Sequence, residues 1–454
     1  MSAVYLIVGI VLGLGVMILI HEWGHFVVAR LCGVRVDVFS IGFGPRIFGW
    51  KKGPTDYRVS VLPLGGYVRM AGQDPTEIDS QGKFSQATGE AAPTGAPDEL
   101  MSRPRWQRAL ISFAGPAVNL IFPIFLLTGL FAVAGVPYPA YLNAPVQVTE
   151  LPPAAINAGN PLKAGDTILS INGTSTPNWE QALIALKPIS AGGTVQMEVQ
   201  DSGQRKSIQV PFKNTTDTSR LLGYAPIRPI IDQVGPGTPA DRAGIREGDI
   251  ITGVNGKSIQ YWEQFMTAVQ GSNGQPVSMV VDRKGKSVQL TVTPKRGAAD
   301  DENVYQIGVA RRDEIAYKSV SFSESVRFSI AETVDDINKT VDVVGKLFSG
   351  RVSIKQLQGP VGISHMAGQA VKRGPLDIIS FMVLISINLG ILNLLPIPIL
   401  DGGNILLLAI EGIMRRDLSM SFKEKFVQVG LVFLLVIFVI VMYNDILRQW
   451  VSHS

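Results

Sequence analysis

The chain of 454 residues is poor in cysteine, in charge and in histidine. Its single cysteine, Cys32, excludes an intramolecular disulfide and says little about the cellular compartment. Only 17% of the residues are charged and the net charge is +4, a balance that gives no reason to expect a nucleic-acid partner. The chain has only four histidines, so a pair of them at metal-ligand spacing is improbable as a chance match.

Basic residues are also missing ahead of the first apolar run, which begins near Ala3. A cleavable signal peptide has a basic segment there, and its apolar core is short. This run instead continues into His21 and Glu22. We therefore expect it to remain in the protein as a membrane span.

Apolar residues make up 46% of the chain and gather towards its two ends. Four stretches are long enough to cross the roughly 30 Å hydrocarbon core of a lipid bilayer. They are 1–30, 109–137, 378–413 (interrupted by prolines) and 426–447. Any one of them could be a buried core helix, but four in one chain predict a polytopic α-helical membrane protein with four transmembrane helices.

Basic residues concentrate in the connection 31–108 and in the short connection before the last span. The positive-inside rule places both on the cytoplasmic side, and both termini and the central region on the other side. We therefore expect a bacterial cytoplasmic (inner) membrane protein with a periplasmic or extracytoplasmic central region. Turn signals in the first part of 31–108 predict a membrane-associated β-hairpin. The stretch 73–103, rich in Gly, Pro and Ala, predicts a mobile loop.

The central region contains an internal repeat. Gly165-Asp166 recurs as Gly248-Asp249, 83 residues later (248 − 165), and an Asn-Gly pair and a Trp-Glu-Gln triplet recur at the same offset. Two copies of one small β-rich domain are therefore expected, at 145–215 and 225–298. Their pattern resembles that of PDZ domains, and the alternative is a generic pair of β-sandwiches.

Apolar residues recur at helical spacing over 319–350, with a polar opposite face. This pattern predicts an amphipathic helix. It is equally consistent with an interfacial or bracing helix and with a helix packed on the second repeat.

The strongest chemical signal is His21-Glu22-Trp23-Gly24-His25. Residues four apart share one face of a helix, so His21 and His25 are placed to hold one Zn²⁺. Glu22 is then beside the metal and is the candidate general base. This H-E-x-x-H pattern is typical of zinc metalloproteases. The alternative is a set of polar residues at the end of a membrane helix.

Two histidines leave a zinc site short of a protein ligand. His365 is on the wrong side of the membrane in the expected topology, and His453 is at the terminus. Asp401 lies in the third span, in an Asn-x-x-Pro-x-Pro-x-x-Asp-Gly-Gly element that begins at Asn393. A carboxylate at membrane depth needs a partner, which a metal supplies. Asp401 is therefore the expected third ligand, and the alternative is a cap of a broken helix.

Three asparagines lie in the predicted spans. Asn388 and Asn393 are in the third span, where their amides are candidates for holding substrate backbone or a developing oxyanion. Asn119 follows Gly115-Pro116 in the second span and is a candidate for the same roles. Hydrogen bonding between helices is the alternative for all three.

Together, the motif at His21–His25, the element ending in Asp401, the segment 62–70 (Leu-Pro-Leu-Gly-Gly-Tyr-Val-Arg-Met) and the two PDZ-like repeats resemble the site-2 protease family of intramembrane zinc metalloproteases. The resemblance covers nearly the whole chain. The loop 73–103 carries no motif.

The resemblance implies regulated intramembrane proteolysis. Such enzymes cut the single membrane span of an anti-sigma factor after another protease has trimmed it, and some clear signal peptide remnants. The PDZ-like pair is implied to act as a size filter. The family's membrane-associated hairpin is implied to pair with an extended substrate, which makes Gly66, Tyr67 and Val68 candidate substrate-binding residues.

Two other functions are compatible with parts of the pattern. A catalytically inactive membrane scaffold would use its PDZ-like domains alone, but the presence of both Glu22 and Asp401 disfavours it. A zinc transporter would need a polar route through several spans, and the fourth carries no ionisable group between Phe426 and Tyr443.

Overall fold

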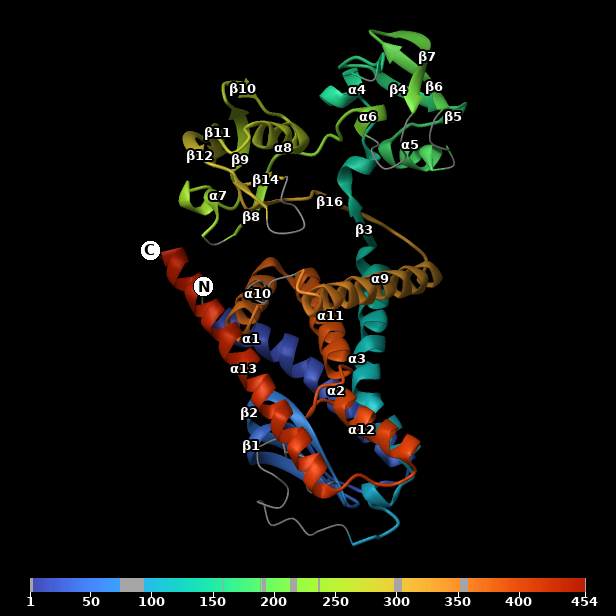
Figure 1. The fold of residues 1–454 in the computed structure, drawn as a ribbon. Coiled ribbons are helices and arrows are strands. Elements are labelled where there is room, and N and C mark those ends of the chain that lie inside the picture. The colour runs from blue at the N-terminus through green and yellow to red at the C-terminus, as the bar shows by residue number, and fades with distance from the viewer. Residues whose placement is uncertain are drawn as a thin grey trace. The chain divides into compact units, whose positions relative to one another are not determined.

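The computed structural model describes residues 3–73, 94–157, 159–187, 189, 193–212, 219–235, 237–297, 304–351 and 358–453. The chain divides into two compact units, and Figure 1 labels their elements. Unit 1 consists of Met1–Val136 and Ser319–Leu447, and unit 2 of Pro137–Lys318 and Arg448–Ser454. The predicted mobile loop lies largely outside the described residues. Its last part, 94–103, ends in a short helix (Leu100–Ser102).

Among the described residues, four helices are long and apolar enough to cross a membrane, which confirms the number of spans expected from the sequence. The first combines α1 (Ala3–Ile10), a π-helical turn (Val11–Gly15) and α2 (Val16–Leu31). The others are α3 (Arg105–Ala134), α11 (Pro375–Asn393) and α13 (Met420–His453).

Helix α3 packs against α2, α9, α11 and α12 in unit 1. It contains two internal prolines, Pro116 and Pro123. Pro123 has no N–H to donate to the carbonyl of Asn119 one turn earlier. Ser386 of α11 donates its hydroxyl to that carbonyl at 2.7 Å. The carbonyl that Pro123 leaves without a helical donor therefore anchors α11 to α3 at Asn119.

Strands β1 (Val36–Lys52) and β2 (Thr55–Met70) lie where the sequence predicts a hairpin, and β2 contacts α2. The strands pair irregularly, so that Phe39 of β1 is opposite both Tyr57 and Val68 of β2. Two parts of β2 therefore flank β1. The later part, 66–70, pairs with β1 on one side and forms an edge of this small sheet.

The predicted third span, 378–413, is two helices. Helix α11 ends at Asn393, and α12 runs over Asp401–Met414 after a non-helical loop, 394–400. The far end of α12 is anchored by Glu411, whose side chain is 1% exposed and lies 3.2 Å from Lys423 Nζ of α13. A buried carboxylate paired in this way fixes the helix that begins with Asp401.

Helix α9 (Phe322–Phe348) lies where the sequence predicts an amphipathic helix. It packs on α3 and α11, and the hydroxyls of Thr128 and Ser329 are 2.7 Å apart. It therefore braces the membrane helices. Helix α10 (Pro360–Arg373) follows and packs on α1 and α11, and Asp445 of α13 accepts a hydrogen bond from the N–H of Gly362 in its first turn.

Unit 2 contains two copies of one β-rich arrangement, as the sequence repeat predicts. The sheet orders are β5-β4-β6-β7 and β10-β9-β11-β12. The elements of the first copy are β4 (Thr167–Ile171), β5 (Thr174–Ser175), α5 (Trp179–Leu186), β6 (Gly193–Asp201) and β7 (Gln204–Phe212). Those of the second are β9 (Ile250–Val254), β10 (Lys257–Ser258), α8 (Trp262–Gly271), β11 (Val277–Arg283) and β12 (Lys286–Val292).

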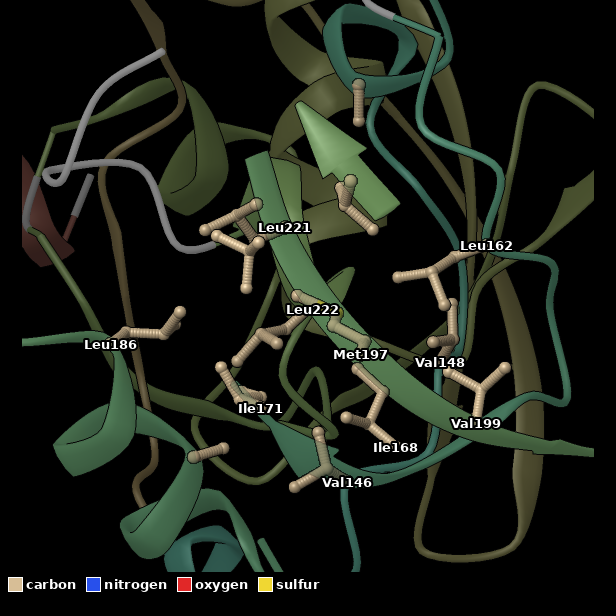
Figure 2. Packing of buried hydrophobic residues seen from close by; sticks show 14 of the residues in the cluster. Val146, Val148, Leu162, Ile168, Ile171, Leu186, Met197, Val199, Leu221 and Leu222 are labelled. Carbon is tan, nitrogen blue, oxygen red and sulfur yellow. The ribbon is translucent and has the colours of Figure 1, made fainter. Parts of the chain in front are cut away.

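Each copy extends beyond its predicted end at residue 215 or 298. In the first copy, Leu221 and Leu222 of α6 (Ser219–Leu222) are buried in the core with Met197 (Figure 2). In the second, β15 (Val309–Arg311) pairs with β8 (Ile231–Val234) and Ile307 is buried. These closing segments are only a few residues long, so they show no periodicity in the sequence.

Short elements complete unit 2. They are β3 (Val136–Pro139), a 3₁₀ turn (Ala140–Asn143), α4 (Pro153–Asn157), α7 (Pro239–Arg242), β13 (Lys295–Arg296), β14 (Tyr305–Gln306) and β16 (Ile315–Lys318). Strands β3 and β16 pair with each other, and the Ala140 N–H donates to the Glu314 carbonyl at 2.7 Å. The chain therefore enters and leaves unit 2 at neighbouring points.

Candidate metal centre

The side chains of His21, His25 and Asp401 converge in unit 1, although Asp401 lies far from the histidines in the sequence. Their ligand atoms all lie within 4.8 Å of one another, and this cluster is the one group of three such residues found among the described residues. The Nε2 atoms of the two histidines are 3.2 Å apart. The two carboxylate oxygens of Asp401 lie 3.1 Å from His21 Nε2 and 3.4 Å from His25 Nε2. Both histidines are buried.

The contacts of His25 show that this cluster suits a cation. His25 Nδ1 lies 2.8 Å from the carbonyl oxygen of Ile111 on α3, and a carbonyl only accepts hydrogen bonds. Nδ1 must therefore carry a proton, so a neutral His25 ring has its lone pair on Nε2. That lone pair faces a carboxylate, so a positive charge is needed between them. Two imidazole nitrogens and one carboxylate are typical zinc ligands and leave a coordination position for water.

The loop before α12 sets the position of Asp401, the first residue of that helix. Ile399 has φ +79°, a left-handed conformation that is unusual for a β-branched residue. A Cβ on Gly402 would lie 2.3 Å from the carbonyl oxygens of Leu394 and Leu395, so only glycine fits against the folded loop. The Pro- and Gly-rich element thus turns the chain back and presents Asp401 at a helix N-terminus, where a negative charge is favoured.

Glu22 is half-buried next to the cluster. Its carboxylate is close enough to interact electrostatically with His25, His21 and Asp401, and with the backbone N–H of Val68 on β2. It is not one of the three ligand groups that meet within 4.8 Å among the described residues. The structure therefore places Glu22 beside the candidate metal position and between that position and the hairpin.

The predicted substrate-binding residues differ in how near they are to the cluster. A Cβ built on Gly66 would lie 3.8 Å from Glu22 Cγ, and Val68 contacts the Glu22 carboxylate as described, so this strand borders the site. The ring of Tyr67 stacks on Phe43. Asn388 and Asn393 are half-buried on α11, and no hydrogen bond of theirs to the cluster is found within the described ranges. Their role stays a prediction.

Helix α3 contributes two contacts that the sequence alone did not assign. A Cβ on Gly115 would lie 2.3 Å from His25 Nε2 and 2.8 Å from His21 Nε2, so this glycine lets α3 close over both rings. The amide of Asn119 lies 3.2 Å from His21 Nδ1. Ile111, Gly115 and Asn119 are four residues apart and form one stripe of the helix. A small residue and a polar residue four apart, Gly115 and Asn119, were the only sign of this face in the sequence of the span.

Comparison with known proteins agrees with this geometry. The model of peptidase family M50 matches residues 9–437, a range that includes all four residues of the candidate centre. The regulator of sigma-E protease RseP of Salmonella typhimurium is 31% identical over 99% of this chain and 100% of its own length. The Escherichia coli protein of the same name is 30% identical over 96% and 97%. A Vibrio cholerae protein whose name includes the words "zinc metalloprotease" is 31% identical over 97% and 98%.

Proposed function

This chain belongs to peptidase family M50 and is a metalloprotease, and on that premise we propose that it is a zinc metalloendopeptidase that hydrolyses peptide bonds in the transmembrane segments of other proteins. The observation that carries the proposal is the convergence of His21, His25 and Asp401 beside Glu22, with both histidines and Glu22 on a helix long and apolar enough to span a membrane.

In this proposal His21, His25 and Asp401 hold the metal. Zinc supplies Lewis acidity that activates water at neutral pH. Glu22 takes a proton from the attacking water and delivers it to the leaving amine. The Ile111 carbonyl holds the His25 ring in the tautomer that leaves Nε2 free to be a ligand. Asn388 and Asn393 are candidates for binding the substrate backbone. They are five residues apart, about 140° around a helix, so they serve different parts of a substrate.

We assign the edge of β2 to substrate binding. The N–H of Val68 faces Glu22, and backbone groups two residues apart on a strand point the same way, so that of Gly66 shares this edge. Tyr67 between them directs its backbone towards β1 and its ring onto Phe43. A substrate span must leave the helical state before its peptide bonds can be attacked. When the substrate pairs with an edge strand as an additional strand of the sheet, it is held in the extended conformation.

Zinc-dependent cleavage of a single-span peptide by the purified protein in detergent tests the proposed function. Removing zinc with a chelator is expected to abolish cleavage, and adding zinc to restore it. Asp401→Ala is expected to weaken zinc binding by more than about 100-fold, beyond what substituting an outer-shell partner costs, because a ligand itself is lost. Zinc content and cleavage would be measured on the same samples. Cleavage by zinc-free protein, or unchanged zinc affinity in Asp401→Ala, contradicts the assignment.

The proposed location is the cytoplasmic membrane of a bacterium, because the relatives are bacterial proteins and the chain has four helices able to span a bilayer. The concentration of basic residues in 31–108 and around 415–425 assigns those connections to the cytoplasm and unit 2 to the other side. Since two relatives are named as regulators of sigma E, the membrane span of an anti-sigma factor is the proposed substrate, with signal peptide remnants as a second class.

We propose that the two β-rich copies of unit 2 are PDZ-like domains that restrict substrates by size. The Gly-Asp turn, the helix after the second strand and the matching sheet orders support the assignment. All candidate metal ligands among the described residues lie in unit 1, so unit 2 has no direct part in the chemistry. A domain on the far side of the membrane is suited to exclude substrates that still carry a bulky extramembrane part.

Deleting residues 141–313 tests the size filter. Ala140 and Glu314 are hydrogen-bonded and β3 pairs with β16, so a short glycine linker joins the cut ends without strain. The shortened protein is expected to cleave a trimmed single-span substrate and also an untrimmed one that the full chain rejects. Zinc content and chromatographic behaviour establish that the variant is folded. Unchanged discrimination by substrate size in a folded, zinc-loaded variant means that unit 2 docks partners instead.

A further inference from the structure

The two histidines of the centre have different partners behind their rings. Each ring turns Nε2 towards Asp401 and Nδ1 towards α3. Behind His25, Nδ1 meets the backbone carbonyl of Ile111 at 2.8 Å. Behind His21, Nδ1 meets the side-chain amide of Asn119 at 3.2 Å. The orientation of His25 is therefore set by backbone, whereas that of His21 depends on one side chain.

The chemistry of a metal ligand determines which amide atom must face His21. A neutral imidazole that offers Nε2 to a metal carries its proton on Nδ1 and needs an acceptor there. Asn119 offers Oδ1, and a half-turn of its amide exchanges Oδ1 with Nδ2. Oδ1 is a buried oxygen without a hydrogen-bond partner when Nδ2 faces the ring. Rotating the amide gives both Oδ1 and the Nδ1 proton a partner.

We propose that Asn119 is a positioning residue of the metal centre, whose Oδ1 accepts the Nδ1 proton of His21 and so fixes the tautomer and the ring orientation in which Nε2 is a metal ligand. This inference rests on the proposed zinc site.

The surroundings of Asn119 make it a rigid support. Its side chain is fully buried, at 0% exposure. Its backbone carbonyl, left without a helical donor by Pro123, accepts the hydroxyl of Ser386. The backbone of Asn119 thus lies where α3 contacts α11, and its buried side chain is on the side of the His21 ring away from Asp401. A hydrogen bond of this kind to a ligand histidine changes metal affinity by about 10–100-fold when it is removed.

The full chain labelled with ¹⁵N-histidine, in detergent with zinc, tests the proposal, because only four imidazoles contribute signals. The wild type is expected to show two Nδ1 protons protected from exchange with water, those of His21 and His25. In Asn119→Leu the His21 proton is expected to become exchangeable, while the His25 proton, bonded to Ile111, stays protected. Zinc affinity is expected to fall by about 10–100-fold. Asn119→Asp keeps an acceptor and is expected to restore the protected proton and the affinity.

Ser386→Ala is the matched control, because it removes a buried hydrogen bond at the same residue without touching the side chain that faces His21. It is expected to lower stability while leaving both protected protons in place. Unchanged zinc affinity and two protected protons in Asn119→Leu overturn the proposal. So does a wild-type spectrum in which the His21 Nδ1 proton exchanges freely, a result that needs no variant to fold. A wild type that binds no zinc refutes the zinc site itself, whereas zinc binding that is indifferent to Asn119 refutes only the role of this residue.

Discussion

Glu22→Gln is expected to lower the rate of peptide cleavage by about 10²–10⁴-fold, the range that general acid–base catalysis contributes. Glutamine has nearly the same shape as glutamate but cannot take a proton from water at neutral pH. The side chain borders both the His21–His25–Asp401 cluster and the edge strand at Val68, so it is placed between the proposed metal and the proposed substrate. The rate would be measured with a single-span peptide in detergent under single-turnover conditions.

Zinc content is the control for this substitution. Because Glu22 is assigned as a base and not as a ligand, the variant is expected to bind zinc as tightly as the wild type. Loss of zinc together with activity would mean that Glu22 has a structural part in the centre. Activity close to that of the wild type would remove Glu22 from the mechanism altogether.

Gly115→Ala is expected to abolish both metal binding and cleavage. The added methyl group would lie 2.3 Å from His25 Nε2 and 2.8 Å from His21 Nε2, far inside van der Waals contact. Either α3 or the two imidazoles must then move, and both rings are also held from behind by contacts to α3. Zinc affinity is expected to fall by more than about 100-fold, beyond the effect of losing one outer-shell hydrogen bond.

Gly129→Ala is the matched control on the same helix, since its added Cβ would have no atom within 4 Å outside its own stretch of helix. It is expected to leave zinc affinity and activity unchanged. Helical content and chromatographic behaviour of the two variants would show whether Gly115→Ala is folded. Zinc affinity within about tenfold of the wild type in Gly115→Ala would mean that the helices have room to separate, and that α3 does not close the site.

The features that the sequence predicted are those set by neighbouring residues. His21 and His25 share a face because a helix repeats every 3.6 residues, whatever surrounds it. The four spans follow from the length of apolar runs, and the two β-rich copies from an offset of 83 residues (248 − 165). Asp401 was predicted as the third ligand by elimination, because a carboxylate in an apolar span next to prolines and glycines needs a partner, and its convergence with the histidines depends on the fold.

The predicted ends of the β-rich copies, in contrast, were too early. Leu221 and Leu222 enter the first core, and β15 closes the second copy against β8. Segments of a few residues carry too little pattern to reveal their partners, and their pairing is decided by the sheet that they complete.

Only the tertiary structure decided what α3 does. As sequence, Gly115 is one of many glycines and Asn119 is a polar residue with several possible uses. Because α3 packs against α2, Gly115 lies against both imidazoles, where any side chain would clash with them. The same packing places the amide of Asn119 beside Nδ1 of His21. Likewise, the edge of β2 reaches Glu22 only because the hairpin folds back beside α2. The proposed ligands are residue types whose chemistry the sequence displays, whereas their orientation depends on contacts between segments far apart in the chain, which no local pattern records.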